Sequence, residues 1–155
     1  MSEITAEQAL QRLTAACARA EHCSGEMREK MYHWGMDEST QDQVIDYLTT
    51  HRYIDDERFT RLFVRDKMQF NKWGRKKIEQ ALWGKHVKES VYLPILDEID
   101  KNEWKTILLP LLETKRKSLH AASDYERKAK LIRFAMSRGF TMDIIEDCLS
   151  TNCKS

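Results

Sequence analysis

The sequence contains three repeats of low similarity, and their presence limits the folds that the chain can adopt. In each repeat, an apolar pair at positions i and i+4 is followed five residues later by another apolar residue, then by polar residues and a further apolar series. The residues that end these motifs are Met36, Val87 and Phe140, which lie 51 and 53 residues apart. Such a period is typical of tandem repeats, in which one unit is too small to bury its apolar face alone.

A further helical pattern precedes each motif, so that every unit contains three helices. With only 5 Gly and 2 Pro, the chain has few helix-breaking residues, and alternating strand patterns are absent. We therefore predict an all-α protein of three tandem three-helix repeats that resemble helix-turn-helix units. The predicted repeats span residues 5–52, 53–100 and 101–150, and a tail follows at 151–155.

The predicted turn before the last helix of a repeat has a characteristic composition. Gly35 and Gly139 fit the left-handed position that ends a helix, and Met36 and Phe140 then act as hydrophobic caps. Asp37 and Thr141 are expected to cap the helices that follow.

The middle repeat departs from this composition. His86 stands where the other repeats have glycine, and Gly84 comes two residues earlier. Pro94 is tolerated near the first turn if its helix begins at Ser90, and it requires a kink if the helix begins earlier. The sequence leaves this boundary open.

Three adjacent carboxylates, Asp55, Asp56 and Glu57, have two possible interpretations. A metal or acid–base site would need further acids or histidines and a cleft, which the sequence does not indicate. In a helix start, Asp55 or Asp56 is the N-cap, the other acids lie at the positive end of the helix dipole, and Ile54 packs on Phe59. We predict the helix start.

The segment around these acids resembles the hallmark of the RecX family, an aliphatic-Asp-Asp-x-Arg-Phe helix followed by a basic helix with the pattern Gly-x-x-x-Ile-x-x-x-Leu. The matching residues are Asp55, Asp56, Arg58, Phe59, Gly74, Ile78 and Leu82. The resemblance covers most of residues 5–99 and implies tandem three-helix repeats in an elongated, curved molecule. It also implies regulation, usually inhibition, of the RecA recombinase through binding to its nucleoprotein filament.

Charge is distributed unevenly, although the net charge is only +1. Residues 1–50 carry nine acids and four bases, whereas residues 65–88 and 115–139 each carry eight Lys or Arg and two acids. Basic blocks of this kind suit contact with a polyanion or an acidic partner. The expected partners are the RecA filament and single-stranded DNA, with double-stranded DNA as a further ligand.

The candidate binding residues come from these two basic blocks. Cations that flank Trp73 at a predicted helix start oppose the helix dipole, so a contact outside the helix is favoured over a merely solvated face. Trp73 and Phe70 flank a loop and can stack on bases, whereas Trp83, beside Leu82, is predicted to lie in the core. The candidates are Lys72, Trp73, Arg75, Lys76, Lys77 and Lys85 in the first block, and Lys115, Arg116, Lys117, Lys130 and Arg133 in the second.

No motif indicates an enzyme, a metal site or a cofactor. The chain lacks a G-x-x-x-x-G-K-[ST] loop, its five His have no ligand spacing, and its four Cys are expected to be free thiols. Without a signal peptide or an apolar run of about 20 residues, the chain is predicted to be a cytoplasmic monomer that does not enter membranes. Two alternatives stay open, namely an autonomous helix-turn-helix-like DNA-binding protein that acts without RecA and a helical scaffold for another acidic partner.

Overall fold

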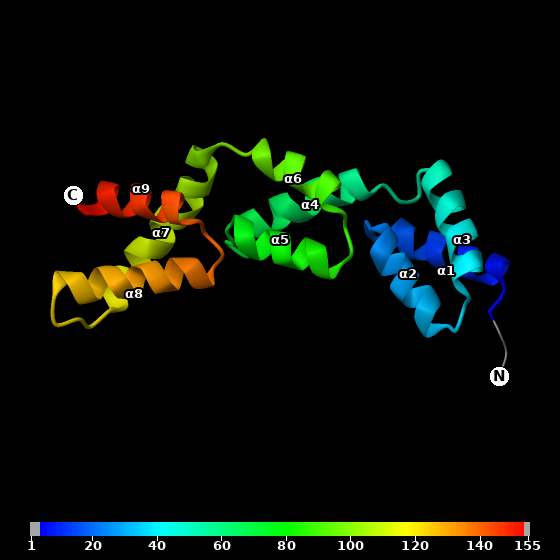
Figure 1. The fold of residues 1–155 in the computed structure, drawn as a ribbon, viewed down its shortest axis with the longest axis horizontal. Coiled ribbons are helices and arrows are strands. Elements are labelled where there is room, and N and C mark those ends of the chain that lie inside the picture. Colours follow the sequence, from blue (N-terminus) through cyan, green and yellow to red (C-terminus); the bar gives the residue numbers. More distant parts are fainter. Residues whose placement is uncertain (1–3, 154–155) are drawn as a thin grey trace. The chain divides into compact units, whose positions relative to one another are not determined.

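The computed structural model describes residues 4–153, with side chains up to Ser150. These residues form nine α-helices and no strand, which confirms the predicted all-α class (Figure 1). Of the predicted tail, residues 154–155 lie outside the described part. The helices are α1 (Ala6–Arg19), α2 (Ser24–His33), α3 (Glu38–Thr50), α4 (Asp56–Gln69), α5 (Arg75–Gly84), α6 (Glu89–Asp97), α7 (Lys101–Ser118), α8 (Asp124–Ser137) and α9 (Met142–Cys153).

The helices divide between two compact units. The first unit contains the chain up to Leu62 together with Leu82–Tyr92, and the second contains Phe63–Ala81 together with the chain from Leu93 onward. In the first unit, α1 and α2 both pack on α3. Its buried core consists of Leu13, Met27, Met31, Val44, Ile45, Leu48 and Ile54.

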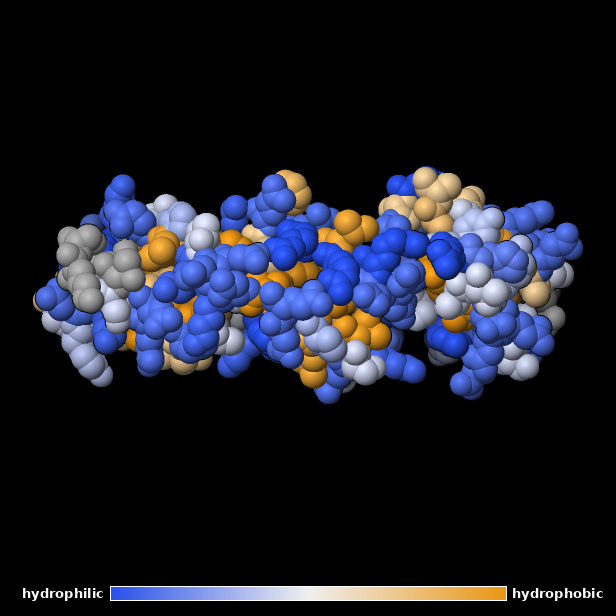
Figure 2. All heavy atoms as spheres, turned by 90° about the horizontal axis from the view of Figure 1, so that it is seen from above, coloured by the Kyte–Doolittle hydropathy of each residue, from blue (hydrophilic) through white to orange (hydrophobic). Residues whose placement is uncertain are grey.

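In the second unit, α7 packs on both α8 and α9. Along α7 the buried residues are Trp104, Leu108 and Leu112, which are spaced four residues apart and so lie on one face of the helix. Ile145 and Cys148 of α9 are completely buried in this unit. The face drawn in Figure 2 is mostly hydrophilic, and hydrophobic residues are visible between the hydrophilic ones.

The same turn ends α2, α5 and α8. Gly35, His86 and Gly139 have positive φ values of 77°, 62° and 94°. The N–H groups of Met36, Val87 and Phe140 donate to the carbonyls of Met31, Leu82 and Ala135 at 3.1, 3.1 and 3.2 Å. This is the hydrogen bond of a Schellman cap, and it explains why an apolar residue recurs five positions after the apolar pair. His86 therefore takes the left-handed position in the middle turn, and α5 ends at Gly84.

Asp37 and Thr141 were predicted to cap the helices that follow the first and the third of these turns. Asp37 caps α3, because its carboxylate accepts a hydrogen bond from the N–H of Thr40 at 2.7 Å. The Thr141 hydroxyl donates to the carboxylate of Asp143 in the first turn of α9. The helix α6 begins at Glu89, which is the earlier of the two possibilities that the sequence left open, so Pro94 is its sixth residue and lies beyond the first turn. Because proline has no N–H, the carbonyl of Ser90 receives no helical hydrogen bond from Pro94.

Two glycines at helix starts lie against a turn of a later repeat. A Cβ atom on Gly25 would come within 1.9 Å of the Lys85 carbonyl oxygen, inside the first unit. A Cβ atom on Gly74 would come within 2.4 Å of the Phe140 nitrogen, inside the second unit. Gly25 and Gly74 are 49 residues apart and thus occupy equivalent positions. Glycine is needed at Gly74 because only a residue without a side chain permits this backbone approach.

Candidate functional site

The aspartates of the hallmark segment accept hydrogen bonds at the starts of two helices, α4 and α2. Asp55 precedes α4, and its carboxylate accepts a hydrogen bond from the N–H of Arg58 at 3.0 Å, which confirms the predicted cap. The Asp56 carboxylate accepts hydrogen bonds from the N–H and the hydroxyl of Ser24 at 2.7 and 2.6 Å. Asp56 therefore accepts hydrogen bonds from the first residue of α2, and its negative charge at this helix start is favoured by the helix dipole.

The remaining hallmark side chains are structural as well. The Arg58 guanidinium donates to Glu21 at 2.8 Å, and Phe59, Ile78 and Leu82 are buried. Within the residues that the structure describes, no group of three or more His, Cys, Asp or Glu side chains could hold a metal ion. The carboxylates of Asp55 and Asp56 therefore act in folding.

A basic cluster surrounds Trp73 at the start of α5. The ammonium groups of Lys67 and Lys77 each lie 5.0 Å from the centre of the Trp73 ring, a distance at which cations are attracted to an aromatic face. Lys72 and Lys76 are exposed, and neither forms an ion pair with any residue between 4 and 153. We call Lys67, Lys72, Lys76 and Lys77, together with Trp73, the Trp73 cluster.

Exposed aromatic side chains occur near the ends of α4 and α5. Phe70 is 72% exposed, and it directly follows the last residue of α4. The Trp73 ring is half-buried. Trp83 is 70% exposed, so the prediction that it belongs to the core is wrong. The buried stripe of α5 runs through Ile78 and Leu82, and the next residue along a helix points about 100° away from such a stripe.

Two candidates in the first basic block are neutralised inside the chain. The Arg75 guanidinium contacts Glu79 at 3.1 Å and Asp97 at 2.7 Å. Burial alone would lower the pKa of Arg75, but these two carboxylates outweigh it and raise the pKa above its ordinary value. Lys85 belongs to the first unit, where it pairs with Glu26 at 3.0 Å. Lys85 is therefore not counted in the Trp73 cluster, which belongs to the second unit.

Most candidates in the second basic block also contact neighbouring side chains. Lys115 lies 5.4 Å from the Phe134 ring centre, Lys117 reaches Glu113 at 4.0 Å, and Lys130 contacts Glu126 and the His120 carbonyl at 3.0 Å each. Arg116 is half-buried and Arg133 is exposed. Of the five candidates, Lys117 and Lys130 have acidic partners, whereas Lys115 faces an aromatic ring, as Lys67 and Lys77 do at Trp73.

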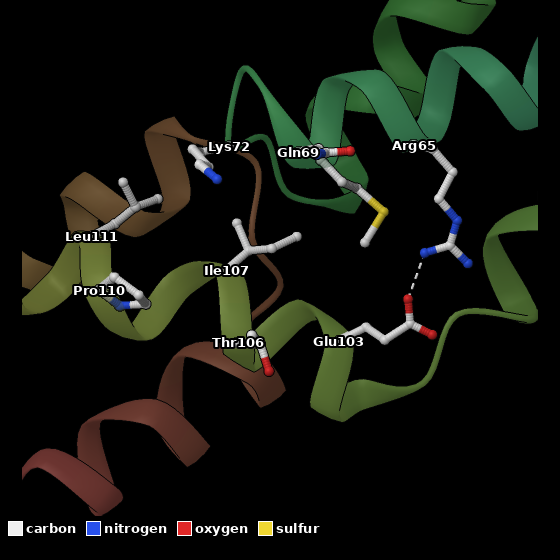
Figure 3. A pocket seen from close by; sticks show the side chains of 9 residues that line it. Arg65, Gln69, Lys72, Glu103, Thr106, Ile107, Pro110 and Leu111 are labelled. Carbon is white, nitrogen blue, oxygen red and sulfur yellow. Dashed lines mark hydrogen bonds and ion pairs between the residues drawn. The ribbon is translucent and has the colours of Figure 1, made fainter.

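An apolar groove lies beside Lys72, between the end of α4 and one face of α7 (Figure 3). Its volume is about 430 Å³, and Met68, Ile107, Pro110 and Leu111 form its apolar wall. Neither this groove nor the part of Lys67 in the cluster was predicted from the sequence. A signal was available for the groove, because Ile107 and Leu111 directly precede the core residues Leu108 and Leu112 and so widen the apolar stripe of α7.

The three cysteines whose side chains the structure describes belong to neither the Trp73 cluster nor the groove. Cys17, Cys23 and Cys148 are free, as predicted, and the Cys153 side chain lies outside the described part. Burial raises the pKa of both Cys23 and Cys148 to about 11, so these thiols are protonated at neutral pH. No helix in residues 4–153 is long and apolar enough to cross a membrane.

These features define a class of protein, namely a chain of consecutive three-helix units that presents a basic aromatic cluster and an adjacent apolar groove. Two family models match the chain, "RecX, second three-helix domain" at residues 55–91 and "RecX, third three-helix domain" at residues 106–149. The regulatory protein RecX of Acinetobacter baylyi is 33% identical over 131 residues, which cover 84% of this chain and 79% of the relative. The chain belongs to the RecX family.

Other relatives agree with this assignment. The regulatory protein RecX of Clostridium botulinum strain Eklund 17B is 35% identical over 124 residues, or 79% of this chain. The match covers only 58% of that relative, so the chain spans little more than half the length of its clostridial relatives. The crystal structure of RecX from Lactobacillus salivarius has a TM-score of 0.85 over 94% of this chain, and its 18% identity supports the fold alone.

Proposed function

We propose that this chain is a non-enzymatic regulator of the RecA recombinase. It binds in the groove of the RecA–DNA filament and inhibits ATP hydrolysis, strand exchange and co-protease activity. Family membership supports the regulatory role, because its relatives carry the name regulatory protein RecX. The observation that carries the proposed contact is the Trp73 cluster, whose cations have no acidic partner within the described residues.

The chemistry of the cluster suits a polyanion that carries planar bases. Lysines without acidic partners can replace the counterions of phosphate groups, which favours binding by releasing those ions. Phe70 offers an exposed ring on which a base can stack. Arg75 and Lys85 are left out of this proposed contact because their charges are already compensated.

The test compares the wild type with the double variant Lys72→Glu/Lys76→Glu. Co-sedimentation with RecA filaments on single-stranded DNA and RecA-dependent ATP hydrolysis are measured over a range of protein and salt concentrations. We expect the wild type to co-sediment and to reduce hydrolysis, and the double variant to bind at least about tenfold more weakly. The slope of log affinity against log salt should become shallower by about 0.7 for each phosphate contact on a single strand that is lost.

The control variant Lys88→Glu/Lys128→Glu makes the same change in net charge at exposed lysines outside the cluster. It should bind as the wild type does. Absence of both co-sedimentation and any effect on hydrolysis for the wild type would refute the proposed regulation. Equal affinity of the wild type for naked duplex DNA and for filaments would instead favour the autonomous DNA-binding alternative.

A further inference from the structure

Three of the four apolar side chains that line the groove of the second unit, those of Ile107, Pro110 and Leu111, do not belong to the buried core. The core face of α7 carries Trp104, Leu108 and Leu112, which are all at most 5% exposed. Ile107 and Leu111 lie on the adjacent face and are only half-buried, and Pro110 is exposed. Leaving such side chains in contact with water is unfavourable, and contiguous apolar surface commonly marks a site of interaction.

The two ends of the groove differ in charge (Figure 3). At one end Arg65 and Glu103 form an ion pair at 2.5 Å, so their charges compensate each other. At the other end Lys72 lies near Leu111, and its ammonium group has no acidic partner between residues 4 and 153. An occupant is therefore favoured when it places apolar groups between these ends and a negative charge at Lys72.

We propose that this groove is the docking site for an acidic, amphipathic segment of a partner protein. The segment inserts one or two aliphatic or aromatic side chains against Met68, Ile107 and Leu111 and directs a carboxylate to Lys72. The inference rests on the proposed function, under which the segment belongs to the recombinase. It assigns the groove and Lys72 at its end to protein contact, and it leaves Lys67, Lys76 and Lys77 of the Trp73 cluster for phosphate contact.

Two other occupants fit the groove less well. Nucleic acid offers no aliphatic side chain to bury, and the apolar wall contains no aromatic ring on which a base could stack. A second copy of this chain could present its acidic residues 1–50. However, a contact between two different surfaces of identical chains does not close on itself in general and produces open chains of molecules.

The test uses the full-length variant Leu111→Glu and the control Met136→Glu, which changes an apolar residue of the same unit that is 51% exposed and outside the groove. Binding to RecA filaments and to a naked single-stranded oligonucleotide is measured in parallel, with circular dichroism as the check on folding. We expect Leu111→Glu to bind filaments at least about tenfold more weakly, and we expect the neutral variant Leu111→Ser to weaken filament binding while it binds the oligonucleotide as tightly as the wild type. The control should match the wild type in both assays, and Leu111→Ser serves as a milder variant if Leu111→Glu does not fold.

The other outcomes separate this inference from the proposed function. Wild-type filament affinity in a folded Leu111 variant would overturn the docking site and leave the regulatory role intact. Loss of oligonucleotide binding in Leu111→Ser would assign the groove to nucleic acid and overturn the inference. Concentration-dependent self-association of the wild type that Leu111→Glu abolishes would assign it to a second copy. Failure of the wild type to bind filaments would refute the regulatory role and the docking site together.

Discussion

The close approach of Gly74 to the turn between α8 and α9 makes Gly74→Ala a sensitive perturbation. The added Cβ would lie 2.4 Å from the Phe140 nitrogen and 2.5 and 2.6 Å from the Gly139 carbonyl carbon and oxygen. All three neighbours are backbone atoms, so no side chain can rotate away to make room. The start of α5 must therefore move away from the turn.

That movement should lower the stability of the protein, and the contacts around Gly74 indicate by how much. It strains two hydrogen bonds, from Gly74 N–H to the Arg138 carbonyl at 2.7 Å and from Lys76 N–H to the Gly139 carbonyl at 2.9 Å. Each such bond contributes about 0.5–1.5 kcal/mol. Overpacking of a closely packed site costs about 1–3 kcal/mol. Because these terms overlap, we expect Gly74→Ala to lower the free energy of unfolding by about 2–4 kcal/mol.

Gly84→Ala is the matched control, because Gly84 is the last residue of the same helix and an added Cβ there meets no atom within 4 Å. Alanine is the better helix former, so this variant should be unchanged or more stable by up to about 1 kcal/mol. Urea unfolding followed by circular dichroism measures the difference, and hydrogen exchange at the Lys76 amide reports on the contact itself. If the two variants differ by less than about 0.5 kcal/mol and the Lys76 amide keeps its protection, the packing argument is wrong.

Two further predictions concern the first unit. Asp56→Ala should lower stability by about 1.5–3 kcal/mol, because it removes charge-assisted hydrogen bonds to Ser24; Glu57→Ala removes an exposed ion pair and should cost less than about 1 kcal/mol in the same urea titration. Burial would raise the pKa of Glu26, but Lys85 and the Cys23 N–H outweigh it and lower that pKa below its ordinary value of 4.5. The stabilisation from Glu26 is thus complete above pH 4.5 and is lost as the pH falls through the lower folded pKa, so Glu26→Gln should destabilise the protein at pH 7 and progressively less below pH 4.5. A stability difference that stays constant across that pH range would contradict this assignment.

The repeat and its turns could be predicted because they depend on neighbours in the sequence. The anchors Met36, Val87 and Phe140 follow from a hydrogen bond that spans five residues, and the Asp55 cap spans three. The left-handed conformation of His86 was not predicted, because the residue type alone favours glycine there. The anchor Val87 defines the position of the turn in the middle repeat. This position specifies the left-handed conformation of His86 although the residue is not glycine.

The candidate site was harder to predict, because charge compensation depends on contacts between distant segments. Lys85 looks like a free cation in the sequence, but Glu26, 59 residues away, neutralises it. Arg75 is neutralised in part by Asp97 at the end of another helix. A count of charges in residues 65–88 does not distinguish Lys85 and Arg75 from Lys72 and Lys76. The fold does distinguish them, because it shows which cations are paired with acids and which can bind a ligand.

The backbone that carries the available cations is held at several points. The Trp73 N–H donates to the Lys67 carbonyl at 3.1 Å, and the hydrogen bonds of Gly74 and Lys76 attach the next residues to the turn at Gly139. A binding surface whose backbone is already ordered loses less conformational entropy when it meets its ligand, and more of the contact energy then appears as affinity. Gly74, which touches no proposed ligand, is therefore expected to affect binding through the placement of Lys72 and Lys76 on either side of it. The glycine of the hallmark pattern thus connects the packing between repeats to the presentation of the Trp73 cluster.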